Sequence, residues 1–325
     1  MPPEWAPHER TWMAFPTQTY ATATSLSDAY QAWAAVARAV AQFEPVTMLV
    51  RGEDRADAEL LLSDTVEWAR VLFDDAWARD SMPAFVKDGE GTLLAVDWSF
   101  NGWGMQEWAT WGHDDAVAEN IALKLRIERY RTEMVNEGGA IEVDGTGRLL
   151  ATRTVQLDPQ RNPSMSAADV EKVFHDTLGV DQVTWFDRGL AGDYLDFGTR
   201  GHVDLLAKFV APGVAVFHDQ RNREHPDFAT SRHLEETLTA AGVQAVALVA
   251  PERVNIDGRT CDWSYVNCYF VNGGLILGTY DDAADTAALA TLSELLPERK
   301  IVTVDARTLF SLGGGVHCIT MQQPK

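Results

Sequence analysis

The sequence predicts an α/β protein built from a repeated unit of hairpin, helix and strand. Apolar patterns typical of helices and of strands alternate along all 325 residues. Four pairs of short apolar runs flank turn residues such as Asp-Gly, Pro-Gly and Asn-Gly, which indicates β-hairpins. The unit recurs every several tens of residues, so we expect about five units. This recurrence favours a repeated module over one doubly wound sheet.

The first predicted elements are a helix at 25–43, a buried strand at 45–50 and a short helix at 53–62. Ser25 or Ser27 can cap the first helix, whose apolar positions recur at helical spacing. The hairpins are predicted at 84–86 with 93–96, 140–143 with 149–152, 209–217, and 266–271 with 275–279. Further helices are predicted at 114–125, 166–178, 231–241 and 282–296.

Composition and charge narrow the function classes. Hydrophobic residues make up 46% of the chain and charged residues 23%, which is typical of a globular protein. No apolar run is long enough to span a membrane and the first residues do not resemble a signal peptide, so we expect a cytoplasmic protein. Three cysteines do not suggest a disulfide framework.

The formal net charge of −21 argues against a nucleic-acid partner, which would need a basic face. The acidity is compatible with attraction of a small cation, or with solubility alone. No G-x-G-x-x-G or P-loop spacing opens a helix, so nucleotide binding has no support.

A cysteine follows a glycine run near the end of the chain. Gly313, Gly314 and Gly315 precede Val316-His317-Cys318. Glycines let a ligand approach the main chain closely, which indicates a thiol presented to a substrate. The alternative is a glycine-rich turn before a buried terminal strand that contains a small apolar cysteine.

Three further segments place ionisable residues beside small or turn-forming residues: Trp77-Ala78-Arg79-Asp80, Asn136-Glu137-Gly138-Gly139 and Gly201-His202-Val203-Asp204. On a strand, His202 and Asp204 would share one face and point to one site. The alternatives are a solvated strand face for that pair, a surface ion pair for Asp80 and a plain turn for Glu137. Four tryptophans of one short stretch form either core or a face for a delocalised cation: Trp98, Trp103, Trp108 and Trp111.

The ionisable residues of these segments also offer oxygen and nitrogen atoms to a metal ion. The chain has no H-E-x-x-H motif and no closely spaced cysteine pair. Cys261 and Cys268 are interpreted as packing residues. We therefore predict no metal site.

Taken in order, these motifs match a known family. They are Trp5-Ala6-Pro7-His8-Glu9-Arg10-Thr11-Trp12-Met13, Trp77-Ala78-Arg79-Asp80, Phe100-Asn101-Gly102-Trp103-Gly104, Glu137-Gly138-Gly139, Gly201-His202-Val203-Asp204 and Gly313-Gly314-Gly315-Val316-His317-Cys318-Ile319-Thr320. From Trp5 to Pro324 the chain resembles the agmatine deiminase family, within the bacterial-type peptidylarginine deiminase superfamily. The resemblance implies a single domain over residues 1–325, folded as a five-bladed α/β propeller (pentein) of pseudo-repeated modules. It also implies a homodimer and no cofactor.

The resemblance implies hydrolysis of a guanidine to a urea and ammonia through a thiouronium on the cysteine. The expected substrate is agmatine, which would give N-carbamoylputrescine. Cys318 would be the nucleophile, and His202 the general acid and then the general base. Glu137 would hold the guanidinium and orient His202. Asp80 and Asp204 would bind the guanidinium nitrogens, Trp77 would lie against its plane, and Gly315 would line the substrate site.

Several positions depart from the family pattern and leave the substrate open. Met82 stands where a glycine is expected, Leu205 where asparagine is common, and Arg200 brings a cation near the pocket. A cation there would suit an anionic tail, so another guanidine, such as a guanidino acid or a peptidyl arginine, is an alternative. Asp193 and Asp196 are candidates for binding a distal amine. A non-catalytic binding propeller and an amidinotransferase are the remaining alternatives.

Overall fold

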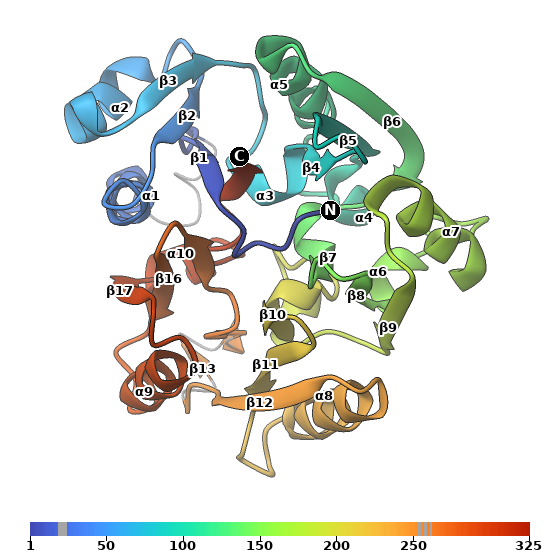
Figure 1. Cartoon of the computed structure of the whole chain (residues 1–325). Coiled ribbons are helices and arrows are strands. Elements are labelled where there is room, and N and C mark those ends of the chain that lie inside the picture. Colours follow the sequence, from blue (N-terminus) through green and yellow to red (C-terminus); the bar gives the residue numbers. More distant parts are fainter. Residues whose placement is uncertain (19–24, 253–254, 257–258, 261) are drawn as a thin grey trace.

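The computed structural model describes residues 1–18, 25–252, 255–256, 259–260 and 262–325. Within these residues, five sheets of three or four strands stand around a common centre (Figure 1). A sixth, two-stranded sheet pairs β13 (Asn255–Ile256) with β14 (Arg259–Thr260). Across the described ranges, no helix has the length and apolar character needed to cross a membrane.

Four of the sheets repeat one path: an antiparallel hairpin, a helix, and a third strand parallel to the second. This confirms the predicted unit. The members are β4 (Ala84–Lys87), β5 (Leu93–Ser99), α5 (Val117–Leu125) and β6 (Glu128–Val135); β7 (Ile141–Val143), β8 (Arg148–Thr152), α7 (Ala167–Leu178) and β9 (Gln182–Phe186); β10 (Ala207–Ala211), β11 (Val214–Asp219), α8 (Phe228–Ala240) and β12 (Gln244–Val249); and β15 (Tyr269–Val271), β16 (Gly274–Thr279), α9 (Asp285–Leu295) and β17 (Lys300–Asp305).

The remaining sheet joins the two ends of the chain. Its strands lie in the order β18 (Met321–Pro324), β1 (His8–Ala14), β2 (Val46–Val50) and β3 (Glu67–Arg70), with α1 (Leu26–Val40) and α2 (Arg55–Leu62) as connections. β18 pairs antiparallel with β1, and the Trp12 indole donates to Gln323 Oε1 at 2.9 Å. The antiparallel strand pair of this module is therefore made by strands about 310 residues apart in sequence.

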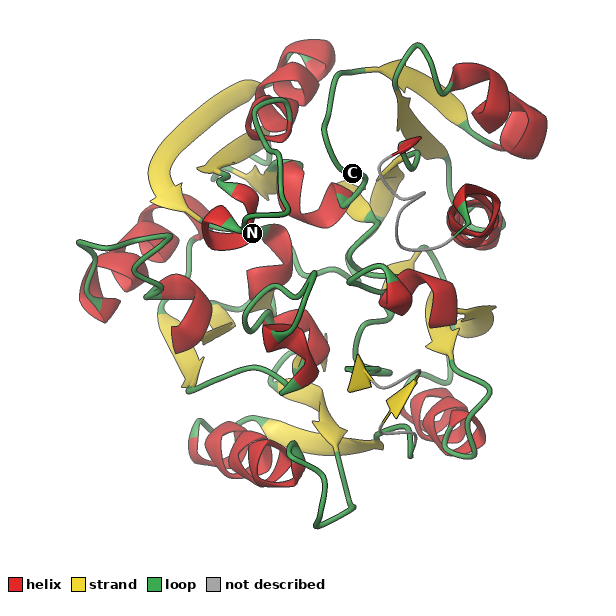
Figure 2. Cartoon of the chain, turned by 180° about the vertical axis from the view of Figure 1, so that it is seen from behind, coloured by secondary structure: helices red, strands yellow, loops and turns green. Residues whose placement is uncertain are grey.

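The predicted helices form because each has an apolar face, and α1 and α7 also begin with a side-chain cap. The Ser25 hydroxyl accepts from the Asp28 N–H at the start of α1, and Ser166 and Asp169 form a capping box on α7. The longer helices lie at the periphery, and short turns and one-turn helices lie nearer the centre (Figure 2). The short elements are α3 (Ala78–Ser81), α4 (Gly102–Met105), α6 (Arg153–Gln156), α10 (Arg307–Ser311), and the 3₁₀ turns η2 (Ser63–Thr65), η3 (Asp114–Ala116), η4 (Gly138–Ala140), η5 (Gly192–Tyr194) and η6 (Val203–Leu205).

Candidate active site

The thiol of Cys318 lies in the turn between α10 and β18, and its residue is 6% exposed. Its Sγ atom is 3.6 Å from Asp204 Oδ2 and accepts from Asn267 Nδ2 at 3.3 Å. Both sequence interpretations hold in part, because the cysteine precedes a buried strand and also faces a carboxylate.

The imidazole of His202 is buried beside two carboxylates. Its Nε2 is 3.4 Å from Glu137 Oε2, and its Nδ1 is 3.9 Å from Asp80 Oδ1. His202 and both acids are at most 5% exposed. The histidine thus joins two residues that the sequence analysis placed in separate motifs.

Gly139 shows that these groups surround one point. A side-chain carbon added to Gly139 would lie 2.5 Å from His202 Nδ1 and 3.1 Å from both Asp80 Oδ1 and Asp204 Oδ2. A carbon added to Gly314 would lie 3.1 Å from Cys318 Sγ and 2.7 Å from the Trp77 ring. The residues predicted to act together are therefore close in space.

Asp80 is held from two sides. Its Oδ1 accepts from the Gly139 N–H at 3.0 Å, and its Oδ2 accepts from Trp103 Nε1 at 2.9 Å. Trp103 belongs to α4, where its backbone takes a left-handed φ of 55° and Asn101 caps the turn. The Phe100-Asn101-Gly102-Trp103-Gly104 motif thus brings an indole N–H to the carboxylate.

Glu137 is held by an arginine that the sequence analysis missed. Arg161 Nε donates to Glu137 Oε1 at 2.9 Å, and both side chains are fully buried. Asp158 accepts from the same guanidinium at 2.9 Å, and so does the Thr199 carbonyl at 2.8 Å. No local pattern marks Arg161, because it contacts Glu137 only after folding.

The prediction that His202 and Asp204 lie on a strand was wrong. His202 precedes η6, which contains Asp204, and β10 begins only at Ala207. Gly201 takes a φ of 125°, and Asp193 Oδ2 accepts from the Gly201 N–H at 2.5 Å. The chain therefore turns where the period-two pattern suggested an extended strand.

Asp193 organises this loop. Its carboxylate also accepts from the N–H and the hydroxyl of Thr199, at 2.7–2.9 Å. The carboxylate is buried and engaged within its own loop, which corrects its assignment as a receptor for a distal amine. Asp196 lies exposed in the same loop.

Asn267 is the second residue that the sequence analysis missed. Its amide contacts Cys318 Sγ, and its Oδ1 accepts from the His317 N–H at 3.0 Å. Gly315 packs against it so closely that an added side-chain carbon would lie 2.3 Å from Asn267 Oδ1.

Burial and neighbouring charges set the protonation of the site. Burial, together with Asp204 and Asp80, raises the pKa of the Cys318 thiol well above its usual value. Burial alone would lower the pKa of His202, but Asp80, Glu137 and Asp204 outweigh it and raise that pKa to about 9. The site therefore holds a neutral thiol beside an imidazolium at neutral pH.

The carboxylates differ from one another. Burial raises the pKa of Asp80, and its acidic neighbours add to this effect. Burial opposes ionisation of Glu137 as well, but Arg161 and His202 outweigh it and lower its pKa. For Asp204, His317 and His202 likewise outweigh burial and lower the pKa.

Among the described residues, four buried polar atoms of the site make no hydrogen bond: Asp204 Oδ1, His202 Nδ1, and Glu137 Oε2 and His202 Nε2, which form an ion pair with each other at 3.4 Å. Buried polar groups are normally paired, so such a group of atoms is typical of a ligand site. Two carboxylate oxygens that each lack a donor suit a flat cation with several N–H groups.

The structure also shows the surroundings of the other residues that the sequence analysis singled out. Met82 and Leu205 are buried. Arg200 is half-exposed, and its guanidinium lies 3.8 Å from Asp158 Oδ2 and 3.4 Å from Gln106 Oε1. Cys268 is a packing residue as predicted: it is fully buried, and burial raises its pKa to about 12. Cys261 lies outside the described residues.

The tryptophan stretch divides between two environments. Trp98 packs edge-on against Phe174 in the core. Trp103 stacks on Trp108 with ring centroids 5.2 Å apart, and Trp108 is 37% exposed. Trp111 is half-buried against the core.

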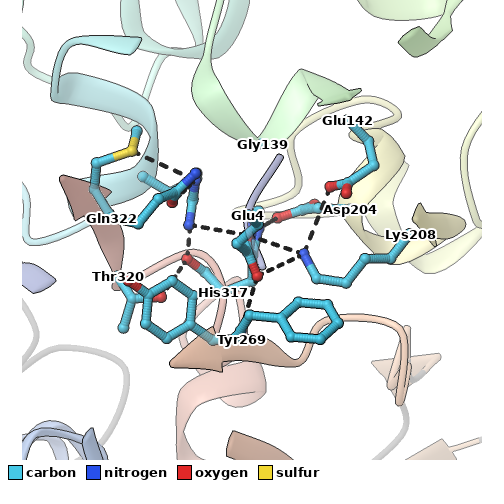
Figure 3. Close-up of polar contacts among 12 residues, drawn as sticks. Glu4, Gly139, Glu142, Asp204, Lys208, Tyr269, His317, Thr320 and Gln322 are labelled. Atoms are coloured by element: carbon cyan, nitrogen blue, oxygen red, sulfur yellow. Dashed lines mark hydrogen bonds and ion pairs between the residues drawn. The ribbon is translucent and has the colours of Figure 1, made fainter. Parts of the chain in front are cut away.

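In the described part of the chain, one group of side chains has the spacing of a metal site: Glu4, Glu142 and His317. Lys208 Nζ lies 3.1 Å from Glu4 and 3.5 Å from Glu142 (Figure 3). The Lys208 ammonium thus already supplies a cation to both carboxylates.

Fold and site together define a class: a mixed α/β protein of small repeated sheets with a thiol and an imidazole among buried carboxylates. Within it, the chain belongs to the Porphyromonas-type peptidyl-arginine deiminase family, whose model matches residues 1–324.

Individual relatives agree with this assignment. A protein of Streptomyces coelicolor, for which agmatine deiminase is the proposed activity, is 48% identical over all of this chain and 98% of its own length. The agmatine deiminase of Pseudomonas aeruginosa strain LESB58 is 37% identical over all of this chain and 95% of its own. The solved agmatine deiminase of Enterococcus faecalis superposes with a TM-score of 0.93 at 30% identity, covering all of this chain and 95% of its own.

Proposed function

We propose that this protein hydrolyses the guanidinium group of agmatine to N-carbamoylputrescine and ammonia. The observation that carries the proposal is the convergence of Cys318, His202 and three buried carboxylates on one point beside Gly139. The names of the relatives support agmatine as the substrate. The net charge of −21 favours a cationic substrate.

Binding uses two carboxylate oxygens that lack a hydrogen-bond partner among the described residues, Glu137 Oε2 and Asp204 Oδ1, and the carboxylate of Asp80, whose oxygens also accept from Gly139 and Trp103. Asp80 and Asp204 accept N–H groups from the guanidinium, and Glu137 Oε2 accepts another while it orients His202. Trp77 lies against the plane of the cation, next to the sulfur. Gly315 lines the site behind the thiol.

The first half of the reaction forms a covalent intermediate. The bound cation offsets the carboxylate charges that raise the pKa of Cys318, and the thiol proton is released. The thiolate attacks the guanidinium carbon, forming a C–S bond and moving a C–N π pair onto nitrogen. His202 then gives its proton to the leaving nitrogen, the C–N bond breaks, and ammonia leaves a thiouronium on Cys318.

The second half returns the enzyme to its starting state. Neutral His202 takes a proton from water while the oxygen bonds to the thiouronium carbon. The tetrahedral adduct then collapses: the C=O bond forms, the C–S bond breaks with its electron pair on sulfur, and the hydroxyl proton passes to that sulfur, so that a neutral urea leaves and the thiol is restored. No group outside the site is needed to balance these steps.

The test combines a substrate panel with one variant. Wild-type protein is expected to release ammonia from agmatine faster than from arginine, a guanidino acid or an arginyl peptide. Cys318→Ser is expected to keep the thermal unfolding midpoint but lose at least ~10³-fold in kcat, because the nucleophile is removed. A mass shift on Cys318 after rapid quenching would identify the intermediate.

Three outcomes would contradict the proposal. Preference for an anionic guanidine would move the substrate to the alternative class. Failure of label from ¹⁸O water to enter the urea would indicate transfer to an amine. Inactivity on every guanidine would indicate a binding protein.

The resemblance and the sheet arrangement support two further expectations about the fold. We infer that residues 1–325 form one domain and that the five sheets are the blades of a propeller, since one module recurs and β18 closes onto β1. A cytoplasmic location and a homodimer remain predictions from the sequence.

A further inference from the structure

His317, the neighbour of the thiol in sequence, lies between two buried carboxylates (Figure 3). Its Nδ1 is 2.8 Å from Asp204 Oδ2, and its Nε2 is 2.7 Å from Glu4 Oε2. All three residues are at most 4% exposed. The reaction described above gives this histidine no task.

The ionisation of the two carboxylates decides the direction of both hydrogen bonds. An ionised carboxylate can only accept, so each ring nitrogen must donate. Both carboxylates are ionised: burial opposes this, but Lys208 and His317 outweigh it at Glu4 and lower its pKa, as His317 does at Asp204. Each ring nitrogen of His317 that faces one of these carboxylates is therefore the donor.

Asp204 is thereby held with its two oxygens in different roles. Oδ2 accepts from His317 and lies 3.6 Å from Cys318 Sγ. Oδ1 is buried without a hydrogen-bond partner. The hydrogen bond from His317 thus occupies the Asp204 oxygen beside the thiol and leaves the other oxygen for a ligand.

Glu4, which contacts the His317 ring on the side away from Asp204, is itself held by several donors. Glu4 also accepts from Lys208 Nζ at 3.1 Å, from the Phe270 N–H at 2.9 Å and from Arg79 Nη2 at 3.4 Å. These donors come from different parts of the chain, so the position of His317 depends on the packing of several modules.

We propose that His317 is a positioning residue for guanidine hydrolysis. It aims Asp204 Oδ1 at the guanidinium and shields Cys318 from the charge of Asp204, and it acts only through Asp204. This inference rests on the proposed function, which assigns Asp204 to the guanidinium.

A double-mutant cycle tests the inference. We compare kcat/KM for agmatine in wild type, His317→Gln, Asp204→Asn and the double variant. His317→Gln is expected to lower kcat/KM by ~10-fold or more in the wild-type background and less than about twofold in the Asp204→Asn background, since contacting residues are strongly coupled. Additive losses would overturn the proposal.

His8→Gln is the matched control. His8 is also buried, with Nδ1 2.9 Å from Glu44 Oε1 and Nε2 2.6 Å from the Glu4 carbonyl, but it contacts none of the site residues in these bonds. Its effect should be the same in both backgrounds. His317→Asn replaces His317→Gln if the latter does not fold.

Alkylation of Cys318 separates this inference from the proposed function, because it requires no turnover. Iodoacetamide labelling is followed at one pH by peptide mass, which distinguishes Cys318 from Cys268. His317→Gln is expected to slow the labelling of Cys318 several-fold, and Asp204→Asn is expected to remove that difference. Equal rates in wild type and His317→Gln would overturn the role of His317, whereas inactivity of wild type on every guanidine would overturn the proposed function alone.

Discussion

The surroundings of His202 and Cys318 raise the pKa of both groups, which suits successive steps of the proposed reaction. Acidic neighbours raise the pKa of His202 to about 9, so the ring is protonated and ready to donate when substrate arrives. Burial and the same acids raise the pKa of Cys318, so the thiol stays neutral until a cation enters. At neutral pH the sulfur of Cys318 is therefore held as the thiol, which is less reactive than the thiolate.

The shift of His202 predicts a pH-dependent contribution to stability. The pKa of His202 is about 9 in the folded protein and 6.5 in the unfolded chain. The contribution to stability is therefore fully present below pH 6.5 and is lost as pH rises through 9. We expect it to reach on the order of 3 kcal/mol, because one pKa unit corresponds to about 1.4 kcal/mol. Urea unfolding from pH 6 to 10 measures it as the difference between wild type and His202→Gln.

His113→Gln is the control for that series. His113 is exposed, and the described contacts of its residue involve its backbone N–H. Its substitution should leave the pH profile of stability unchanged. A difference between wild type and His202→Gln that stays constant up to pH 10 would contradict the assigned shift.

At this scale the sequence identified the groups that carry chemistry but not those that hold them. Cys318, His202, Glu137 and Asp204 stand in motifs with glycines, Asp80 follows Trp77-Ala78-Arg79, and the structure brings these residues together. Arg161, Asn267 and the role of His317 depend on contacts across 24 to 113 residues of sequence. Such contacts leave no local pattern.

Among the elements, the glycine turns bring the main chain close to the site residues. Gly139→Ala in η4 would place a carbon 2.5 Å from His202 Nδ1 and 3.1 Å from two carboxylates. We expect a fall in kcat/KM of ~10-fold or more, because overpacking costs about 1–3 kcal/mol and here displaces reacting groups. Steady-state kinetics with agmatine measure it.

Gly89→Ala is the matched control for Gly139→Ala. A carbon added to Gly89 meets no atom within 4 Å, and this glycine has no left-handed φ. The variant should keep wild-type kinetics. Equal kcat/KM for the two alanine variants would show that Gly139 does not face the substrate site.

The one-turn helix α4 supports Asp80 through a single indole. Trp103→Phe keeps a ring in place but removes the 2.9 Å bond to Asp80 Oδ2. A hydrogen bond to a charged group contributes about 1.5–3 kcal/mol, so we expect kcat/KM to fall ~10–100-fold. Trp98→Phe is the control, since the buried Trp98 indole N–H has no hydrogen-bond partner. A similar loss in both variants would contradict a specific role for the indole bond.

Elements with regular patterns were predicted well, and those shaped by tertiary bonds were not. The caps at Ser25 and Ser166 and the apolar faces of α1 and α7 fix those helices locally. The segment around His202 alternates like a strand, but its backbone turns because Asp193 binds Thr199 and Gly201. Period-two spacing is therefore insufficient evidence for a strand beside glycine.

At the scale of the whole molecule, the net charge of −21 should draw a cationic substrate toward the protein. The screening length falls from about 30 Å at 0.01 M salt to about 3 Å at 1 M. We expect kcat/KM for agmatine to fall several-fold over this range, while kcat changes little. Initial-rate measurements at constant pH test this, and a salt-independent kcat/KM would contradict it.

The order of the sheets could be anticipated only in part. The repeated turn signals revealed the module and its number of copies. The pairing of β1 with β18 has no counterpart in local sequence, because the two strands lie about 310 residues apart. Their union was implied only by the resemblance to a closed family fold.

The pairing of β1 with β18 also bears on biosynthesis. The ribosome delivers β1 early, yet this strand lacks its antiparallel neighbour until residues 321–324 have emerged. Cys318 stands just before that last strand. The growing chain therefore acquires Cys318, the proposed nucleophile, and the strand that pairs with β1 almost simultaneously. We expect the proposed active site to be unassembled until both have been synthesised.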